Sequence, residues 1–88
     1  MLNYLVEFLG TFLFLSVVVA TEQPLLIAMS LLLVILLGGS VSGGHFNPAI
    51  SVMYWAKGVL TNIDLLGYVA AQLLGGVAAL GIFNVLHR

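Results

Sequence analysis

Long apolar runs alternate with short polar segments along this chain, and the runs are too long for ordinary core helices. A helix needs about 20 predominantly apolar residues to cross the hydrocarbon core of a bilayer. Three runs approach or reach that length, which predicts an all-α membrane protein with three transmembrane helices. We expect these helices at about residues 3–20, 25–40 and 64–87.

A shorter apolar segment lies between the second and third predicted spans. It begins at Pro48, after a glycine-rich stretch, and Lys57-Gly58 ends it with a cation and a glycine stop. A helix of about ten residues is roughly 15 Å long, half of the hydrocarbon core. Irregular backbone is tolerated at such depth only inside protein or along a watery cavity. We therefore predict a re-entrant loop and half-helix at about residues 41–57, within one domain covering residues 1–88.

Asn47 and Pro48 are residue types that favour a helix start. Asparagine caps a helix with its side-chain oxygen, and proline is tolerated at the first helical position. The helix N-terminus carries a partial positive charge of about +0.5, and half-helix ends of this kind form transport sites near the membrane midplane. Such an end opposes cations and protons, whereas a neutral polar solute can pass. An ordinary helix start in a surface loop is the alternative.

The composition supports a membrane protein and argues against other classes. The chain is 62% hydrophobic and 6% charged, whereas soluble domains carry about 25% charged residues. It has no cysteine, a net charge of −1 and no basic run, so we expect no thiol metal site and no nucleic-acid partner. We see no paired carboxylates, Ser-His-Asp set or phosphate-binding motif. We therefore expect a protein that is not an enzyme and has no cofactor or metal.

Three motifs in order resemble the aquaporin and aquaglyceroporin family. Residues 42–49 (SGGHFNPA) resemble its first signature loop, residues 7–12 (EFLGTF) its first-helix motif, and residues 68–75 (YVAAQLLG) its third-helix motif. The resemblance covers nearly the whole chain. It implies a passive channel for water and perhaps small neutral solutes such as glycerol. Because family members have six spans and two Asn-Pro-Ala loops, the chain corresponds to one half of that fold.

The candidate pore-lining residues follow the loop and the start of the half-helix. They are Gly43, Gly44, His45, Asn47, Pro48 and Ala49. Alignment with the family places Ile27 and Ile50 where its filter has an aromatic residue and an arginine, which implies an apolar constriction. His45 could instead be a loop histidine bonded to backbone, and the two isoleucines could be packing residues.

Two further groups of residues are expected to support the loop and the helix packing. We expect Glu7 to accept hydrogen bonds from loop N–H groups, because buried backbone donors need partners; the alternative is a side chain that reaches to the interface. Gln72 is expected to bond the loop or a neighbouring helix. Small residues recur every fourth position on the last span and form a ridge that permits close helix packing. This ridge consists of Gly67, Ala71, Gly75 and Ala79.

One half of a six-span fold cannot enclose a pore, so the second half must come from elsewhere. The simplest source is an identical chain related by a two-fold axis in the membrane plane, which inserts the two chains in opposite directions. Lys57 and Arg88 fall on opposite sides and give little orientation bias. The interfacial aromatic residues all map to the side of residue 1. They are Tyr4, Tyr54, Trp55 and Tyr68.

An antiparallel homodimer with dual topology is therefore our hypothesis for the pore. Because the family forms tetramers of pores, the resemblance further implies a possible tetramer of dimers. Two alternatives remain open: a non-conducting membrane scaffold or regulatory subunit, and a half-channel completed by a different polypeptide.

Overall fold

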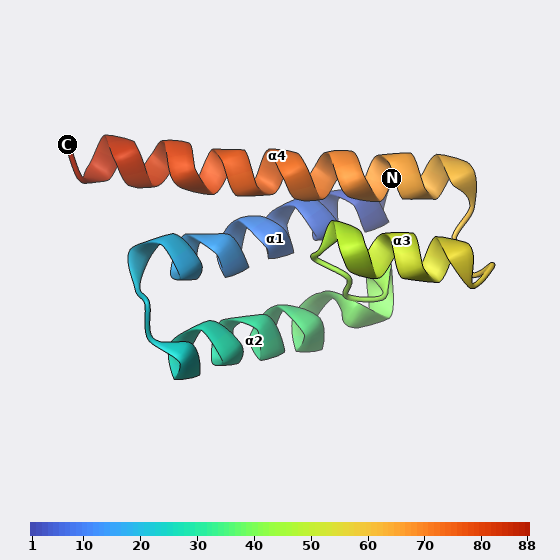
Figure 1. The fold of residues 1–88 in the computed structure, drawn as a ribbon, viewed down its shortest axis with the longest axis horizontal. Helices are drawn as coiled ribbons and strands as arrows, with labels where there is room; N and C mark the ends of the chain where they lie inside the picture. Colours follow the sequence, from blue (N-terminus) through green and yellow to red (C-terminus); the bar gives the residue numbers. More distant parts are fainter.

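The computed structural model describes residues 1–88 and contains four helices (Figure 1). They are α1 (Leu2–Ala20), α2 (Pro24–Ser42), α3 (Pro48–Ala56) and α4 (Asn62–Leu86). By length and composition, α1, α2 and α4 can each cross a membrane. The predicted fold class is confirmed: an all-α membrane protein with three spans and one half-length helix, consistent with half of an aquaporin fold.

Helix α1 is the centre of the bundle. It packs against α2 on one side and α4 on the other, while α3 packs against α4. Figure 1 shows that α3 begins near the middle of the long axis and runs toward the end of the bundle where the N-terminus lies. Its nine residues rise about 14 Å at 1.5 Å per residue. The chain therefore turns back into the bundle after α2 before it leaves again through α3.

The end of α2 differs from the expected boundary. The helix continues through the glycines at 38 and 39 and ends at Ser42, two residues beyond the expected end. Gly43 stops it in the left-handed conformation (φ 92°), with its N–H bonded to the Gly39 carbonyl. The irregular loop is therefore only residues 43–47. At the other boundary, α4 begins at Asn62 because the Thr61 hydroxyl caps it by accepting from the Asp64 N–H at 3.1 Å.

The small-residue ridge of α4 packs against α1 within the chain. A Cβ atom added at Gly75 would lie 2.8 Å from the backbone oxygen of Phe8, and one added at Gly67 would lie 2.5 Å from the Tyr4 ring. Ala71 and Ala79 on the same ridge are buried. The ridge is thus used inside one chain, and it offers no free face for assembly of a tetramer.

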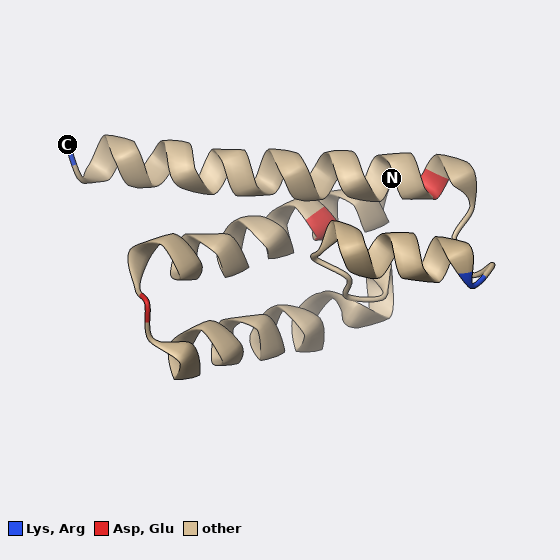
Figure 2. Ribbon diagram, in the orientation of Figure 1, with Lys and Arg blue, Asp and Glu red and all other residues tan.

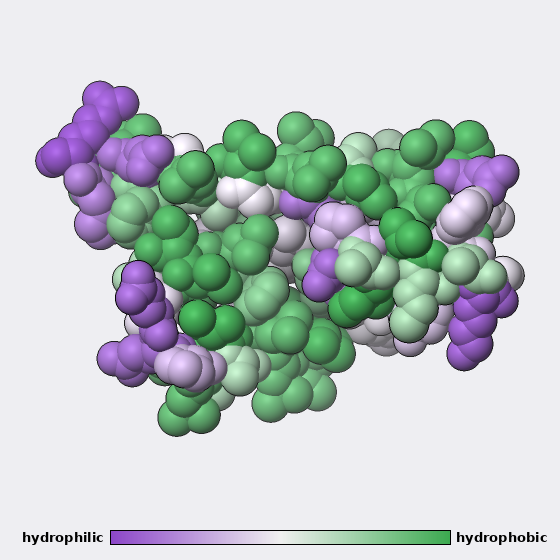
Figure 3. Space-filling view, viewed as in Figure 1, coloured by the Kyte–Doolittle hydropathy of each residue, from purple (hydrophilic) through white to green (hydrophobic).

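The outer surface is apolar between two polar ends. Figure 3 shows hydrophobic residues over most of one face, with hydrophilic residues at both ends and a small group near the middle. Figure 2 shows charges at both ends and one acidic position within α1. Trp55 is exposed at the end where α3 stops, whereas Tyr68 is only 4% exposed. The expectation that Tyr68 belongs to an interfacial aromatic belt is therefore wrong, because its ring packs inside the bundle.

Because α1 and α4 pack closely, a methyl group added on the contact face of α4 should lower stability more than one added elsewhere on that helix. Gly75→Ala should destabilise the protein by about 1–3 kcal/mol, because its methyl group meets backbone rather than a mobile side chain. Gly81→Ala is the matched control on the same helix, since nothing lies within 4 Å of its Cβ position. Unfolding in detergent micelles measures both free energies. Equal stabilities for the two variants would contradict the packing described here.

Candidate pore-lining site

The loop at residues 43–47 has an unusual backbone. Gly43, Gly44 and Phe46 have φ values of 92°, 69° and 52°. Glycine adopts a positive φ at little cost, but Phe46 is the one non-glycine residue with a positive φ. Its backbone is therefore strained, and burial of its ring has to offset that strain.

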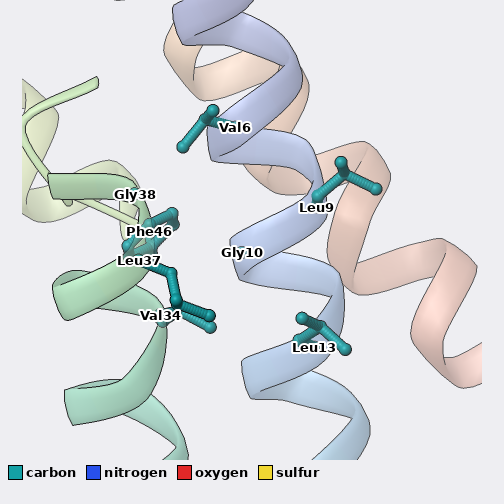
Figure 4. Close-up of a pocket in the computed structure, with 8 residues that line it drawn as sticks. All are labelled: Val6, Leu9, Gly10, Leu13, Val34, Leu37, Gly38 and Phe46. Atoms are coloured by element: carbon teal, nitrogen blue, oxygen red, sulfur yellow. The ribbon is translucent and has the colours of Figure 1, made fainter. Parts of the chain in front are cut away.

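The Phe46 ring is anchored between two helices by glycines. The residue is 3% exposed; a Cβ atom at Gly10 would lie 2.1 Å from its ring, and one at Gly38 would lie 3.3 Å away. Together with residues of α1 and α2, Phe46 lines a pocket of about 200 Å³, and Figure 4 shows these side chains. Sequence reasoning did not single out Phe46 as a support, although two glycines inside long apolar helices were a usable signal.

The Glu7 carboxylate lies beneath the loop and is completely buried. Its Oε1 accepts from the Phe46 N–H and from Gln72 Nε2, both at 2.8 Å. Its Oε2 accepts from the Ser42 hydroxyl at 2.6 Å and the His45 N–H at 3.1 Å. These donors match the roughly four lone-pair positions of an ionised carboxylate. The charge is therefore stabilised by hydrogen bonds, and no cation bonds to it.

Hydrogen bonding divides the loop backbone into satisfied donors and free acceptors. The N–H groups of residues 43–46 bond to Gly39, the Ser42 hydroxyl and Glu7. Tyr68 donates to the Ser42 carbonyl at 2.7 Å. No hydrogen bond within the chain reaches the carbonyl oxygens of residues 43–46. Unpaired backbone groups at membrane depth require a watery cavity or a partner, so these carbonyls need a source of donors outside the chain.

Asn47 adds an exposed amide to these carbonyls. Its Oδ1 accepts from the Ala49 N–H at 2.9 Å and caps α3, with Pro48 at the first helical position. Its Nδ2 makes no hydrogen bond within the chain and can donate to a solute. Ala49 is also exposed, and Ile50 is half-buried.

The remaining candidates are distributed unevenly. The His45 side chain is 6% exposed and bonds Ser51 through Nδ1 at 2.8 Å, so it belongs to the inner polar cluster. Ile27 lies near the start of α2, which makes no packing contact with α3. One chain therefore does not bring Ile27 and Ile50 together. Ser42, Ser51 and Tyr68 also contribute to the cluster. The sequence did not predict this role for them, because it shows that they are polar but not which distant groups they contact.

The fold and this loop define a class of protein. A half-helix that begins at depth within an apolar bundle, beside free carbonyls, is typical of membrane channels and transporters. The model of the major intrinsic protein family matches residues 1–88. The chain belongs to that family, and it is an integral membrane protein.

Curated relatives agree with this assignment. The chain is 33% identical to aquaporin Z of Photorhabdus laumondii over 91% of its length, and 36% identical to glycerol uptake facilitator protein-like 6 of Lactiplantibacillus plantarum over 90%. It is 47% identical to an aquaglyceroporin of Toxoplasma gondii over 65% of its length. The chain spans 41% of the length of each of the first two relatives. No solved structure matched in the corresponding comparison.

The buried carboxylate predicts that the loop depends on its charge. Glu7→Gln replaces one acceptor oxygen with an NH₂ group, which faces N–H donors. Each buried donor left without a partner costs about 1–3 kcal/mol, so we expect lower stability and faster hydrogen exchange at the Phe46 amide. Glu22→Gln is the matched control, because Glu22 is exposed and lies between α1 and α2. Unchanged exchange at Phe46 in the Glu7 variant would contradict this role.

Proposed function

We propose that this protein forms a passive channel for water and small neutral solutes such as glycerol. The observation that carries the proposal is the run of free carbonyls at residues 43–46 beside the exposed Asn47 amide. Relatives that cover nearly the whole chain are named as an aquaporin and a glycerol uptake facilitator, which supports the same solutes.

The hydrogen-bonding groups of the loop explain how such a solute could leave bulk water. Its hydroxyl protons would bond to the carbonyls of Gly43, Gly44 and His45, and its oxygen would accept from Asn47 Nδ2. The start of α3 at Pro48 adds the positive end of the helix dipole, which opposes protons and other cations. The solute thus exchanges water hydrogen bonds for protein ones without carrying charge through the site.

We further propose that two antiparallel copies of this chain enclose the pore. α2 packs only against α1, and α3, with its rise of about 14 Å, covers only part of the 42 Å long axis. A groove of about 330 Å³ between α1 and α4 ends at Asn47 and Pro48, where the partner's half-helix could continue the line of α3. The groove is also lined by Thr11 and Gln72, whose Oγ1 and Oε1 have no hydrogen-bond partner. In such a pair the two Asn47 amides would meet at the centre.

The same pairing would build identical constrictions at both mouths. Ile27 of one chain and the partner's Ile50 would form an apolar collar where the family has an aromatic residue and an arginine. Without a cationic side chain, the collar would be wider or drier than an arginine filter. This favours small neutral solutes and gives no strict preference for water.

The distribution of charge supports insertion in both directions. Lys57 ends α3 and Asp64 lies in the first turn of α4, whereas Glu22 lies between α1 and α2 and Arg88 follows α4. Figure 2 shows that charges of both signs occur at both ends of the molecule. Neither end therefore has an excess of Lys or Arg, which is the feature that orients membrane proteins. Trp55 and Tyr54 lie at one end only, so an inverted pair would supply aromatic residues to both membrane faces.

Osmotic measurements on vesicles that contain only this protein test conduction. We expect fast shrinkage in stopped-flow light scattering, and entry of glycerol when glycerol is the osmolyte. Permeability equal to that of protein-free vesicles would reject a homomeric pore. Two hypotheses would then remain: a non-conducting scaffold, and a half-channel that needs a different polypeptide. Reconstitution together with a candidate second half distinguishes them, because only the half-channel would then conduct.

Asn47→Leu should abolish that conduction, because it removes the amide and leaves an apolar side chain at the narrow centre. The variant also removes a helix cap, which is worth about 1 kcal/mol. Thr61→Ala is the matched control, since it removes the cap of α4 away from the loop. Loss of conduction in both variants, or in neither, would contradict a direct role for Asn47.

Labelling of introduced cysteines tests the inverted pair. The native chain has no cysteine, so Leu2→Cys and Glu22→Cys each provide one site, at opposite ends of α1. With dual insertion, a membrane-impermeant maleimide applied to intact cells should label a fraction of each variant. After permeabilisation, the same reagent should label the remaining molecules. Complete labelling of one variant and none of the other would reject dual topology.

A further inference from the structure

A chain of hydrogen bonds connects the buried carboxylate to the loop histidine. Gln72 Nε2 lies 2.8 Å from Glu7 Oε1 and 2.8 Å from Ser51 Oγ. Ser51 Oγ in turn lies 2.8 Å from His45 Nδ1. Glu7, Gln72 and Ser51 are each at most 2% exposed, so water does not replace these contacts.

The carboxylate fixes the direction of this chain. An ionised carboxylate only accepts hydrogen bonds, so Gln72 must turn its NH₂ group toward Glu7. The opposite orientation would place two acceptor oxygens 2.8 Å apart. The second Gln72 proton is then donated to Ser51 Oγ. Ser51 has no other acceptor within hydrogen-bond distance than His45 Nδ1, so its own proton is donated there.

We propose that Ser51 is a positioning residue that fixes His45 as the tautomer with its proton on Nε2. A neutral imidazole carries one N–H, and the hydrogen bond at one nitrogen decides which nitrogen is protonated. Because Nδ1 accepts from Ser51, the proton is on Nε2. Tyr54 and Tyr68 hold the ring in place, with centroids 4.9 and 5.0 Å from that of His45.

The Nε2 nitrogen of His45 lies close to Gly43 in the loop. It has no hydrogen-bond partner within the chain. The fully buried polar side-chain atoms without a partner are Thr11 Oγ1 and Gln72 Oε1, so His45 Nε2 is not fully buried. A Cβ atom at Gly43 would lie 3.2 Å from Nε2, so the missing side chain at Gly43 leaves this nitrogen uncovered. His45 therefore adds a donor to a row of acceptors. This step rests on the proposed function. The hydroxyl group of a solute can donate a hydrogen bond to a loop carbonyl and accept one from Nε2–H, and this pair of groups selects water and polyols.

Nitrogen NMR of the histidines tests the tautomer independently of conduction. The chain labelled with ¹⁵N-histidine in lipid nanodiscs should be measured at about pH 8, above the ordinary imidazole pKa of about 6.5. We expect an unprotonated Nδ1 and a protonated Nε2 for His45. His87→Gln assigns the signals, since the chain has only two histidines. A protonated Nδ1 on His45 in the native sequence would overturn the proposal.

Two variants of Ser51 separate positioning from general structure. Ser51→Ala removes the donor and should give a mixture of tautomers, whereas Ser51→Thr keeps the hydroxyl and should restore the Nε2–H form. An unchanged single tautomer in Ser51→Ala would also overturn the proposal. If Ser51→Ala does not fold, the native and Ser51→Thr spectra still decide the tautomer.

The same variants connect the tautomer to transport. In proteoliposomes, Ser51→Ala should lower glycerol permeability about fivefold, the effect of one hydrogen bond, and Ser51→Thr should retain it. Glycerol permeability unchanged by Ser51→Ala would overturn the role of Nε2–H as a donor to solutes. The expected tautomer in a chain that does not conduct would reject the proposed channel while supporting the positioning by Ser51.

Discussion

Irregular backbone inside a membrane requires hydrogen-bond partners, and in this protein one carboxylate accepts hydrogen bonds from two of the four N–H groups of residues 43–46. Glu7 accepts from two loop N–H groups and from two side chains that also contact the loop or α3. The N–H groups of the loop are thus satisfied, whereas the carbonyls of residues 43–46 have no partner within the chain. The division of the loop into paired donors and free acceptors thus depends on a carboxylate that is completely buried.

Close helix packing makes that arrangement possible. Gly75 allows α4 to approach the backbone of α1, which brings Gln72 within reach of Glu7. Gly10 and Gly38 leave the space that the Phe46 ring fills, and burial of this ring offsets the strained φ of the same residue. The glycines inside the spans therefore serve the site as directly as those in the loop.

Much of this could be predicted from the sequence, because membrane spans depend on local composition. The apolar runs gave the three spans, and Asn47-Pro48 marked the half-helix because capping is local chemistry. The end of α2 was less predictable, since glycines that break a helix in water can continue one that packs closely. The spacing of Gly67 to Ala79 indicated a packing face, but periodicity does not identify the helix opposite. Contacts of Ser42, Ser51 and Tyr68 join distant segments, and no local pattern encodes them.

Symmetry gives the proposed pore a property that six-span relatives do not share. Two inverted copies would place the same collar at each mouth and the same loop and His45 on each side of the centre, so a solute meets the same sequence of groups from either side. A six-span chain can vary its two halves separately and put an arginine in only one. An inverted pair cannot, because Ile50→Arg would put an arginine in both collars of the pore. Whatever residue stands at position 50 is therefore repeated in both collars, and in this chain it is the uncharged Ile50.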